Sequence, residues 1–300
     1  MRVRMVAEVL CGVLSLGVAL AGASEWGDLR GRFVYDGQPP ERKPLAITAD
    51  IEFCGSKNLR EEHLVVHPTN KGVANVIVWM HLGRRDATPA VHESHAATAK
   101  AEVDLDASNC RFDPHVCLLR TSQTLVLHNR NPIGDSVKID TLFNPPINLM
   151  LPIESVVRHR FTDEERMPAR VSCSVHPWES GWLLVKELPY MAVSDENGEF
   201  TISHLPTGKW TFQFWHERSD YVSEVKIGGQ TVNWLRGRVE IDIPASGNDL
   251  GTILLAPRLF EKGPGEAVKK LGQAPRDRAE SPSSCGFCSE PVPFFHSLGA

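Results

Sequence analysis

The stretch Cys173-Ser174-Val175-His176-Pro177-Trp178-Glu179 is followed closely by the apolar run Trp182-Leu183-Leu184-Val185. The apolar run is typical of a buried strand, and the stretch before it is typical of a turn between strands. A thiol and an imidazole that are separated by two residues on one turn can reach the same metal ion. This part of the sequence therefore predicts β structure with a candidate metal site at the end of its strands.

Short apolar runs of the same kind recur along the chain and are separated by turn dipeptides such as Asp36-Gly37 and Asn197-Gly198. Several runs alternate with a period of two and are rich in β-branched and aromatic residues, as strands are. We find no long amphipathic helix. With 23 Gly and 21 Pro to supply turns, the pattern predicts an all-β protein made of β-sandwiches. The further strand-like runs are residues 32–35, 75–80, 124–128, 210–215, 238–243 and 252–255.

The composition narrows the possible functions. The chain has 300 residues, of which 42% are hydrophobic and 23% are charged, which is ordinary for a globular protein. Its net charge of −5 argues against a nucleic-acid partner, because nucleic-acid-binding proteins carry a basic patch. The sequence contains no Gly-x-Ser-x-Gly, no His-Glu-x-x-His and no phosphate loop, so we expect a protein that is not an enzyme.

The first 23 residues resemble a secretory signal peptide. Arg2 and Arg4 precede the apolar stretch 10–22, and Ala21-Gly22-Ala23 forms a small-x-small cleavage site. The alternative is a membrane anchor, but the uncharged stretch is shorter than the roughly 20 residues that span a bilayer. We expect a periplasmic or secreted protein with no stable membrane span after cleavage.

Type 1 copper sites use a Cys-x(2–4)-His-x(2–4)-Met loop together with a second His from a distant strand. The Cys173 loop and several other stretches together resemble exported cupredoxin-domain proteins, of the kind called methylamine-utilisation-like and found in planctomycete-type bacteria. The resemblance runs from about residue 29 to 217. The matching stretches are 110–116, 123–129, 144–145, 173–178, 189–200, 205–210 and 215–217.

The resemblance implies a cupredoxin-like Greek-key sandwich and an immunoglobulin-like, carboxypeptidase-regulatory-like sandwich of the carbohydrate-binding-like kind. We expect an N-terminal β region at 24–101, the cupredoxin-like domain at 102–188 and the regulatory-like sandwich at 189–257. Residues 258–300 lack periodicity and are expected to form a disordered tail. The resemblance also implies a disulfide between Cys54 and Cys110.

In an alternative domain arrangement, the regulatory-like sandwich is formed by two segments that are separated in the sequence. Residues 30–37 look like its first strand, and residues 73–81 would join it. The cupredoxin-like domain would then be inserted between these segments and residues 189–257.

The sequence departs from the family pattern at two of the copper-ligand positions. Asp135 stands where the family has its upstream His, and Glu179 stands where it has the axial Met. The candidate metal ligands are therefore Cys173, His176, Asp135 and Glu179. Carboxylates are harder donors, so this set suits zinc at least as well as copper. His128 and His115 are alternative substitutes for the missing His.

A competing hypothesis pairs Cys117 with Cys173 in a disulfide, which would remove the thiolate from any metal site. The pair Cys285 and Cys288 lies in the expected tail, where a local disulfide or half of a metal site are both compatible with the sequence.

Two functions follow from these observations. The first is an exported, non-catalytic binding or structural module of the cell envelope with a degenerate type 1 copper site. Its partner would be an envelope protein or a carbohydrate. The second is a metal-binding cupredoxin with altered ligands that holds copper or zinc and takes part in electron transfer. Four tryptophans are candidates for a sugar-stacking platform, although core packing is their more frequent use; these are Trp178, Trp182, Trp210 and Trp234.

Overall fold

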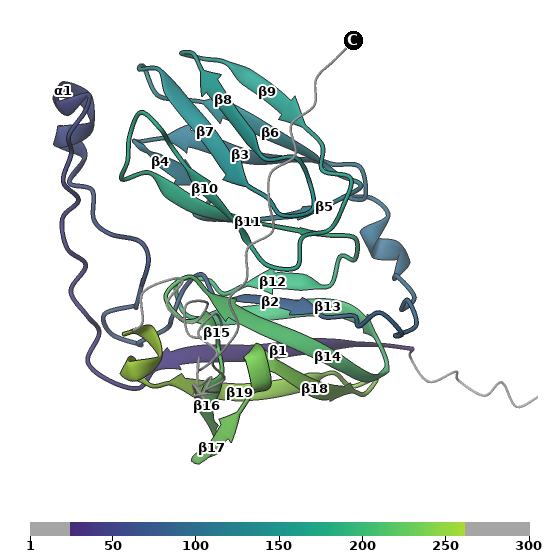
Figure 1. Ribbon diagram of the computed structural model, residues 1–300. Helices are drawn as coiled ribbons and strands as arrows, with labels where there is room; N and C mark the ends of the chain where they lie inside the picture. Colours follow the sequence, from purple (N-terminus) through teal and green to yellow (C-terminus); the bar gives the residue numbers. More distant parts are fainter. Residues whose placement is uncertain (1–24, 262–300) are drawn as a thin grey trace, which may run out of the picture. The chain divides into compact units, whose positions relative to one another are not determined.

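The structure is a computed structural model that describes residues 25–261, and its strands form two β-sandwiches (Figure 1). The expected signal peptide and the pair Cys285 and Cys288 lie outside the described residues. Within residues 25–261, no helix is long and apolar enough to cross a membrane.

The first sandwich consists of two sheets that share one apolar core. Phe33 and Ile253 of one sheet pack in the same buried cluster as Val78 and Phe212 of the other. The first sheet has the order β13 (Glu199–Pro206), β1 (Trp26–Tyr35), β19 (Asn248–Leu255), β16 (Glu224–Ile227) and β17 (Gln230–Asn233). The second has the order β12 (Met191–Val193), β2 (Ile77–Met80), β14 (Gly208–His216) and β15 (Asp220–Tyr221), with β18 (Arg238–Ile243) paired to β14.

The second sandwich is built in the same way around Leu105 and Leu127 of one sheet and Val137 and Leu183 of the other. One sheet has the order β5 (Val116–Arg120), β11 (Ser180–Lys186), β10 (Ala169–Ser172), β7 (Asp135–Asp140) and β8 (Ile147–Leu151). The other has the order β4 (Arg111–Asp113), β3 (Glu102–Ser108), β6 (Thr124–Asn129) and β9 (Val156–His159). The predicted all-β class is confirmed, and the second sandwich occupies the part of the chain expected to be cupredoxin-like. The immunoglobulin-like assignment of the first sandwich stays a prediction.

The first sandwich takes its strands from both sides of the second one in the sequence. β1 pairs antiparallel with β13 and parallel with β19, and β2 pairs with both β12 and β14. All strands of the second sandwich lie between β2 and β12 in the chain. This is the divided arrangement, with the second sandwich inserted into the first.

The interface between the two sandwiches contains an apolar cluster and a polar contact beside it. Trp215 of β14 and Leu184 of β11 belong to one buried cluster, and the Trp182 ring meets the Trp215 ring edge-on at 4.7 Å between centroids. Beside it, His115 Nε2 lies 2.5 Å from Glu217 Oε1. Burial alone would lower the pKa of His115, but the carboxylates of Glu217 and Glu62 together outweigh burial and the pKa is raised. The interface therefore contains a charged pair that fixes one sandwich against the other.

A long arm connects β1 to β2 and carries the short helices α1 (Ile51–Cys54) and η1 (Gly55–Lys57). Figure 1 shows α1 beside the second sandwich, away from the strands that flank the arm in the sequence. The Cys54–Cys110 disulfide attaches it there, with 5.8 Å between the two Cα atoms. This predicted disulfide is confirmed.

The remaining short helices are η2 (Glu93–His95), η3 (Leu235–Gly237) and η4 (Pro257–Phe260). Phe260 of η4 is buried, and its ring lies 5.8 Å from that of Tyr35. The packed structure thus continues past residue 258, where the sequence analysis expected the tail to begin, because Phe260 adds apolar surface to the first core.

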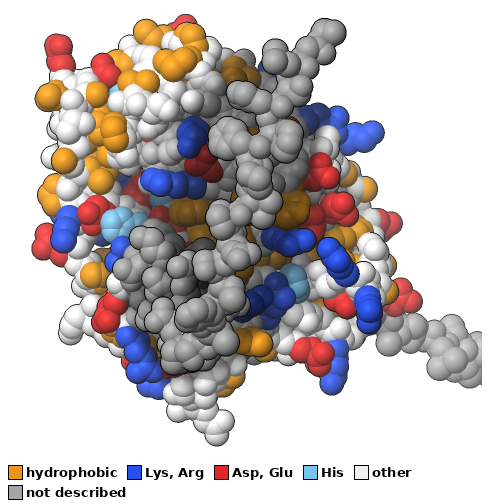
Figure 2. All heavy atoms as spheres, in the orientation of Figure 1, with side chains coloured by type: hydrophobic (Ala, Val, Ile, Leu, Met, Phe, Trp, Pro, Cys, Tyr) orange, Lys and Arg blue, Asp and Glu red, His pale blue; other side chains and the backbone are white. Residues whose placement is uncertain are grey.

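The surface fits the weakly acidic net charge. On the coloured part of the face in Figure 2, acidic and basic side chains are interspersed, without a continuous basic patch. Apolar side chains gather at the upper end of this face, over the second sandwich. The most exposed of the large apolar residues in that sandwich are Leu142 and Met150, at 76% and 65% of their full exposure.

A substitution at Gly198 tests the close packing of β1 against the turn before β13. Its φ is +79°, and a Cβ there would lie 2.1 Å from the Phe33 carbonyl oxygen. Gly251 also has a positive φ, +63°, but a Cβ there would meet nothing within 4 Å. Gly198→Ala should lower the free energy of unfolding by roughly 2 kcal/mol or more, and Gly251→Ala by only about 1 kcal/mol, in urea denaturation. Equal losses would contradict this close approach of β1 to the turn.

Candidate metal centre

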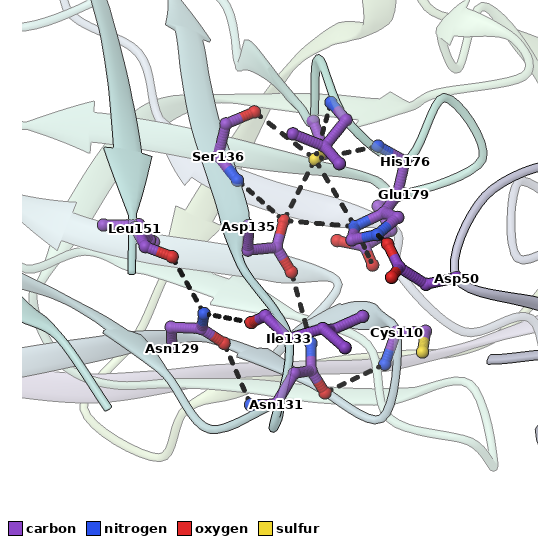
Figure 3. Close-up of polar contacts among 12 residues, drawn as sticks. Asp50, Cys110, Asn129, Asn131, Ile133, Asp135, Ser136, Leu151, His176 and Glu179 are labelled. Carbon is purple, nitrogen blue, oxygen red and sulfur yellow. Dashed lines mark hydrogen bonds and ion pairs between the residues drawn. The ribbon is translucent and has the colours of Figure 1, made fainter. Parts of the chain in front are cut away.

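Four potential metal ligands converge at one end of the second sandwich (Figure 3). Asp135 begins β7, while Cys173, His176 and Glu179 lie in the loop from β10 to β11. β7 and β10 are neighbouring antiparallel strands, with Ser172 opposite Lys138, so the loop after β10 returns beside the start of β7. One donor atom from each of the four residues lies within 4.8 Å of all the others, and all four residues are buried.

The Cys173 thiol is held from several directions. Its Sγ accepts hydrogen bonds from the backbone N–H groups of Val175 at 3.3 Å and His176 at 3.1 Å. It also lies 3.3 Å from Ser136 Oγ, and it donates to Asp135 Oδ1 at 3.0 Å. Burial, and then the hydrogen bond to Asp135, raise the pKa of the thiol to about 11. In the metal-free protein the thiol therefore keeps its proton.

His176 is fully buried and has different partners on its two ring nitrogens. Nδ1 faces the cluster, 3.5 Å from Asp135 Oδ1, 3.3 Å from Glu179 Oε1 and 3.8 Å from Cys173 Sγ. Nε2 lies 2.9 Å from Asp50 Oδ2. A carboxylate only accepts hydrogen bonds, so the Asp50 contact fits a proton on Nε2, and Nδ1 is the ring nitrogen that faces the cluster. Metal-bound histidines have this arrangement in general.

Glu179 is the unsatisfied member of the cluster. Neither of its carboxyl oxygens makes a hydrogen bond, although both are buried. Burial, and then the nearby charge of Asp135, raise the pKa of Glu179 to about 9. Glu179 Oε1 lies 3.3 Å from His176 Nδ1 but accepts no hydrogen bond there, so this buried group still favours a proton or a cation.

Asp135 is fixed by the loop that precedes it. Ser136 N donates to its Oδ1 at 2.8 Å, and Asn131 Nδ2 donates to its Oδ2 at 3.2 Å. Asn131 N in turn donates to Asn129 Oδ1, and Asn129 Nδ2 donates to the carbonyl groups of Ile133 and Leu151 (Figure 3). These amide side chains hold the backbone of the loop, so Asp135 cannot move away from the cluster without breaking them.

The structure brings together all four candidate ligands named from the sequence, but neither alternative histidine. His115 is paired with Glu217 between the sandwiches. His128 lies on β6, in the other sheet of the second sandwich, opposite Asp106 and Val156. His176 is therefore the only histidine that residues 25–261 contribute to this cluster.

The alternative Cys117–Cys173 disulfide is not formed, because both cysteines are free thiols. The strand register gives the reason. Cys117 lies opposite Leu183, and Leu183 lies opposite Ala169, which is four residues before Cys173. Four strand residues correspond to about 13 Å along the sheet. This is beyond the Cα separation of about 7 Å that a disulfide tolerates.

The four tryptophans considered for a sugar platform belong to three different apolar clusters. Trp210 and Trp234 pack in the core of the first sandwich, and Trp182 packs between the sandwiches. Trp178 packs beside the Cys54–Cys110 disulfide. They do not share one surface.

Sequence reasoning missed Asp50. It is 126 residues away from His176 in the chain and lies in an arm without periodicity. No motif or spacing marks it, because its position depends on the path of the arm to the second sandwich.

No protein-family model and no curated protein matches the chain. Solved structures with partial similarity include a purple cupredoxin from Nitrosopumilus maritimus, with 18% identity over 29% of this chain and 100% of that chain and a TM-score of 0.24. A reduced Cu(I) form of an amicyanin mutant has 18% identity over 34% of this chain and 95% of that chain, with a TM-score of 0.26. A Cu-containing nitrite reductase from Thermus scotoductus SA-01 has 18% identity over 36% of this chain and 25% of that chain, with a TM-score of 0.26.

Replacing Glu179 by Gln should stabilise the metal-free protein and weaken metal binding. The folded pKa of about 9 exceeds the ordinary 4.5, so the stability that the proton contributes is complete below about pH 4.5 and is lost as pH rises through 9. Gln imitates the protonated acid at every pH. We expect Glu179→Gln to raise the free energy of unfolding by roughly 1–3 kcal/mol at alkaline pH, and to change it little at pH 4.5, in urea denaturation with chelator.

The matched control is Glu187→Gln, which removes a carboxylate from an exposed residue of the same chain. It should leave the stability and its pH dependence as in the wild type. Loss of stability in Glu179→Gln at alkaline pH would contradict an unsatisfied Glu179 in the metal-free cluster.

Proposed function

We propose that this protein is an exported, non-catalytic, cupredoxin-like protein whose degenerate copper site binds a zinc ion. The observation that carries the proposal is the convergence of one sulfur, one imidazole nitrogen and two carboxylate donors in a buried cluster with an unsatisfied Glu179. Zinc accepts this mixture of donors in a four-coordinate, tetrahedral site.

The acidic groups of the cluster favour the binding of a divalent cation. The cluster contains Asp135, Glu179 and Cys173 around the single imidazole of His176, and these residues are at most 6% exposed, so solvent screens a negative charge there poorly. A bound zinc ion would replace the protons of the thiol and of Glu179, since ligands bind metals in their deprotonated forms. The same ion would give the carboxyl oxygens of Glu179 a partner.

The residues do not fit a type 1 copper ion. Such a centre needs two histidines and a thiolate, with a weak thioether as the axial ligand. Here His176 is the single imidazole of the cluster, Asp135 replaces the second one, and Glu179 replaces the thioether. We therefore propose no electron-transfer step at this centre.

A structural role fits the closed coordination better than catalysis. Four protein donors complete a tetrahedral zinc site, and catalytic zinc sites keep one position open. Bound zinc would stabilise the loop from β10 to β11 and join it to β7. Export is supported by the signal-like residues 1–23 and by the Cys54–Cys110 disulfide, since disulfides persist in oxidising compartments. The envelope protein or carbohydrate partner stays a prediction from the resemblance.

The experiment is metal analysis of the purified protein after zinc loading and gel filtration. We expect one zinc per chain in the wild type, and a rise in thermal midpoint that chelator reverses, because a ligand that binds only the folded state stabilises it. At a free zinc concentration about 100 times Kd, the stabilisation is about 2.7 kcal/mol. Cobalt should give a thiolate charge-transfer band, and copper should give no intense blue band.

Cys173→Ala should abolish zinc retention and the cobalt band. Cys117→Ala is the matched control, because Cys117 is the other buried free thiol in residues 25–261 and lies outside the cluster. It should retain both properties. Wild-type protein without stoichiometric zinc, or an intense blue copper band, would contradict the proposed function.

A further inference from the structure

Asp50 occupies an unusual position at the start of α1. Its backbone is left-handed, with φ 44° and ψ 43°, and its side chain does not cap its own helix. An aspartate at this position normally accepts a hydrogen bond from the first turn of the helix. Here the backbone carbonyl of Asp50 accepts from Phe53 N and Cys54 N, and the carboxylate turns away to His176 Nε2.

Asp50 supplies the hydrogen-bond acceptor for Nε2 of the fully buried His176. Its own side chain keeps 39% of its full exposure, so solvent screens the charge of the pair on the Asp50 side only. A left-handed backbone and an unused cap both cost free energy. Strained backbone that persists against such costs is commonly found where it positions a functional group. In this structure the group that it positions is the imidazole of the proposed zinc ligand.

The Cys54–Cys110 disulfide holds Asp50 at that place. α1 has four residues, from Ile51 to Cys54, so Asp50 lies one helical turn from the disulfide. The disulfide lies in a small apolar cluster that contains side chains of the arm and of the second sandwich. The partly buried members of that cluster are Leu45, Ile47, Phe53, Ile133 and Trp178.

The partner cysteine also contacts the residues around the metal ligands. Cys110 N donates to Asn131 Oδ1, and Asn131 holds Asp135. The Cys110 carbonyl oxygen accepts from Trp178 Nε1, and Trp178 lies between two of the proposed ligands in the sequence. The disulfide therefore fixes the arm to Cys110, whose backbone contacts Asn131 beside the cluster (Figure 3).

We propose that Asp50 is a positioning residue for the zinc ligand His176, and that the Cys54–Cys110 disulfide keeps Asp50 in place, so that zinc affinity depends on the oxidation state of this disulfide. The inference rests on the proposed function. A carboxylate on the outer nitrogen fixes the ring orientation and makes the inner nitrogen a stronger ligand. Without the disulfide, the arm spends less time at His176, because the effective concentration of Asp50 there falls.

The chemical step is thiol–disulfide exchange with an external dithiol. The Cys54–Cys110 S–S bond breaks, both cysteines gain hydrogen, and the dithiol is oxidised to its own disulfide. Zinc undergoes no redox change. The expected consequence is that the protein holds zinc tightly in an oxidising compartment and loosely in a reducing one.

The first experiment measures zinc affinity by competition with a chromophoric chelator. Asp50→Asn keeps a side chain that tolerates a left-handed backbone and removes the charge. We expect about 10- to 100-fold weaker zinc binding, and a shifted cobalt spectrum, with the thermal midpoint of the metal-free protein unchanged. The matched control is Glu52→Gln, an exposed carboxylate on the same helix, which should bind zinc as the wild type does.

The second experiment tests the disulfide through a thermodynamic cycle. Cys54→Ala/Cys110→Ala should weaken zinc binding by a factor similar to that of Asp50→Asn, and the combined variant should lose little more, because both changes act on one contact. The disulfide is fully buried, so its reduction in the wild type by a phosphine is first verified by a count of free thiols. The reduced protein should then show the same loss of zinc affinity; the phosphine becomes the phosphine oxide and does not chelate zinc as dithiols do. The disulfide-free variant should not respond to the phosphine.

The possible results distinguish the proposed zinc site from the proposed positioning role of Asp50. Wild-type protein that binds no zinc would overturn the proposed function. Zinc binding by the wild type with an equal affinity in Asp50→Asn would overturn the positioning role while leaving the zinc site intact. Losses that add fully in the combined variant would overturn the link between the disulfide and Asp50. If the disulfide-free variant does not fold, the Asp50→Asn comparison and the phosphine titration still decide between these outcomes.

Discussion

The end of the second sandwich depends on one electrostatic constraint, the burial of three acidic groups around a single imidazole. Asp135, Cys173 and Glu179 lie close to His176, away from water. Buried acids must keep protons or meet a cation. In the metal-free protein, protons are retained on the thiol and on Glu179, whose pKa values rise to about 11 and about 9. A bound zinc ion would satisfy the same constraint and connect the loop from β10 to β11 with β7.

The surrounding structure is arranged to hold this cluster in a fixed geometry. The amide side chains of Asn129 and Asn131 hold the loop before Asp135. The arm from the first sandwich supplies Asp50, and the Cys54–Cys110 disulfide attaches the arm. The site therefore combines four residues of the second sandwich with Asp50, which the connection between β1 and β2 brings to it.

Local sequence patterns predicted the elements but not their mutual positions. Alternating apolar runs such as 210–215 predicted strands because one face of each is buried. The four candidate ligands followed from Cys173 and His176 together with Asp135 and Glu179, the two positions where the sequence departs from the family that it resembles. The distance that separates Cys117 from Cys173 depends on strand register, and the position of Asp50 depends on the path of the arm. Neither leaves a local pattern in the sequence, so both required the structure.

We propose that one zinc ion is coordinated by the four clustered side chains. The most direct measurement is a crystal structure of the zinc-loaded protein with anomalous data at the zinc edge. We expect one strong peak bonded to Cys173 Sγ at about 2.3 Å and to His176 Nδ1 at about 2.0–2.1 Å, with one oxygen each from Asp135 and Glu179. A zinc-loaded crystal without a peak at this cluster, or with zinc bound elsewhere and the thiol still protonated against Asp135, would contradict the claim.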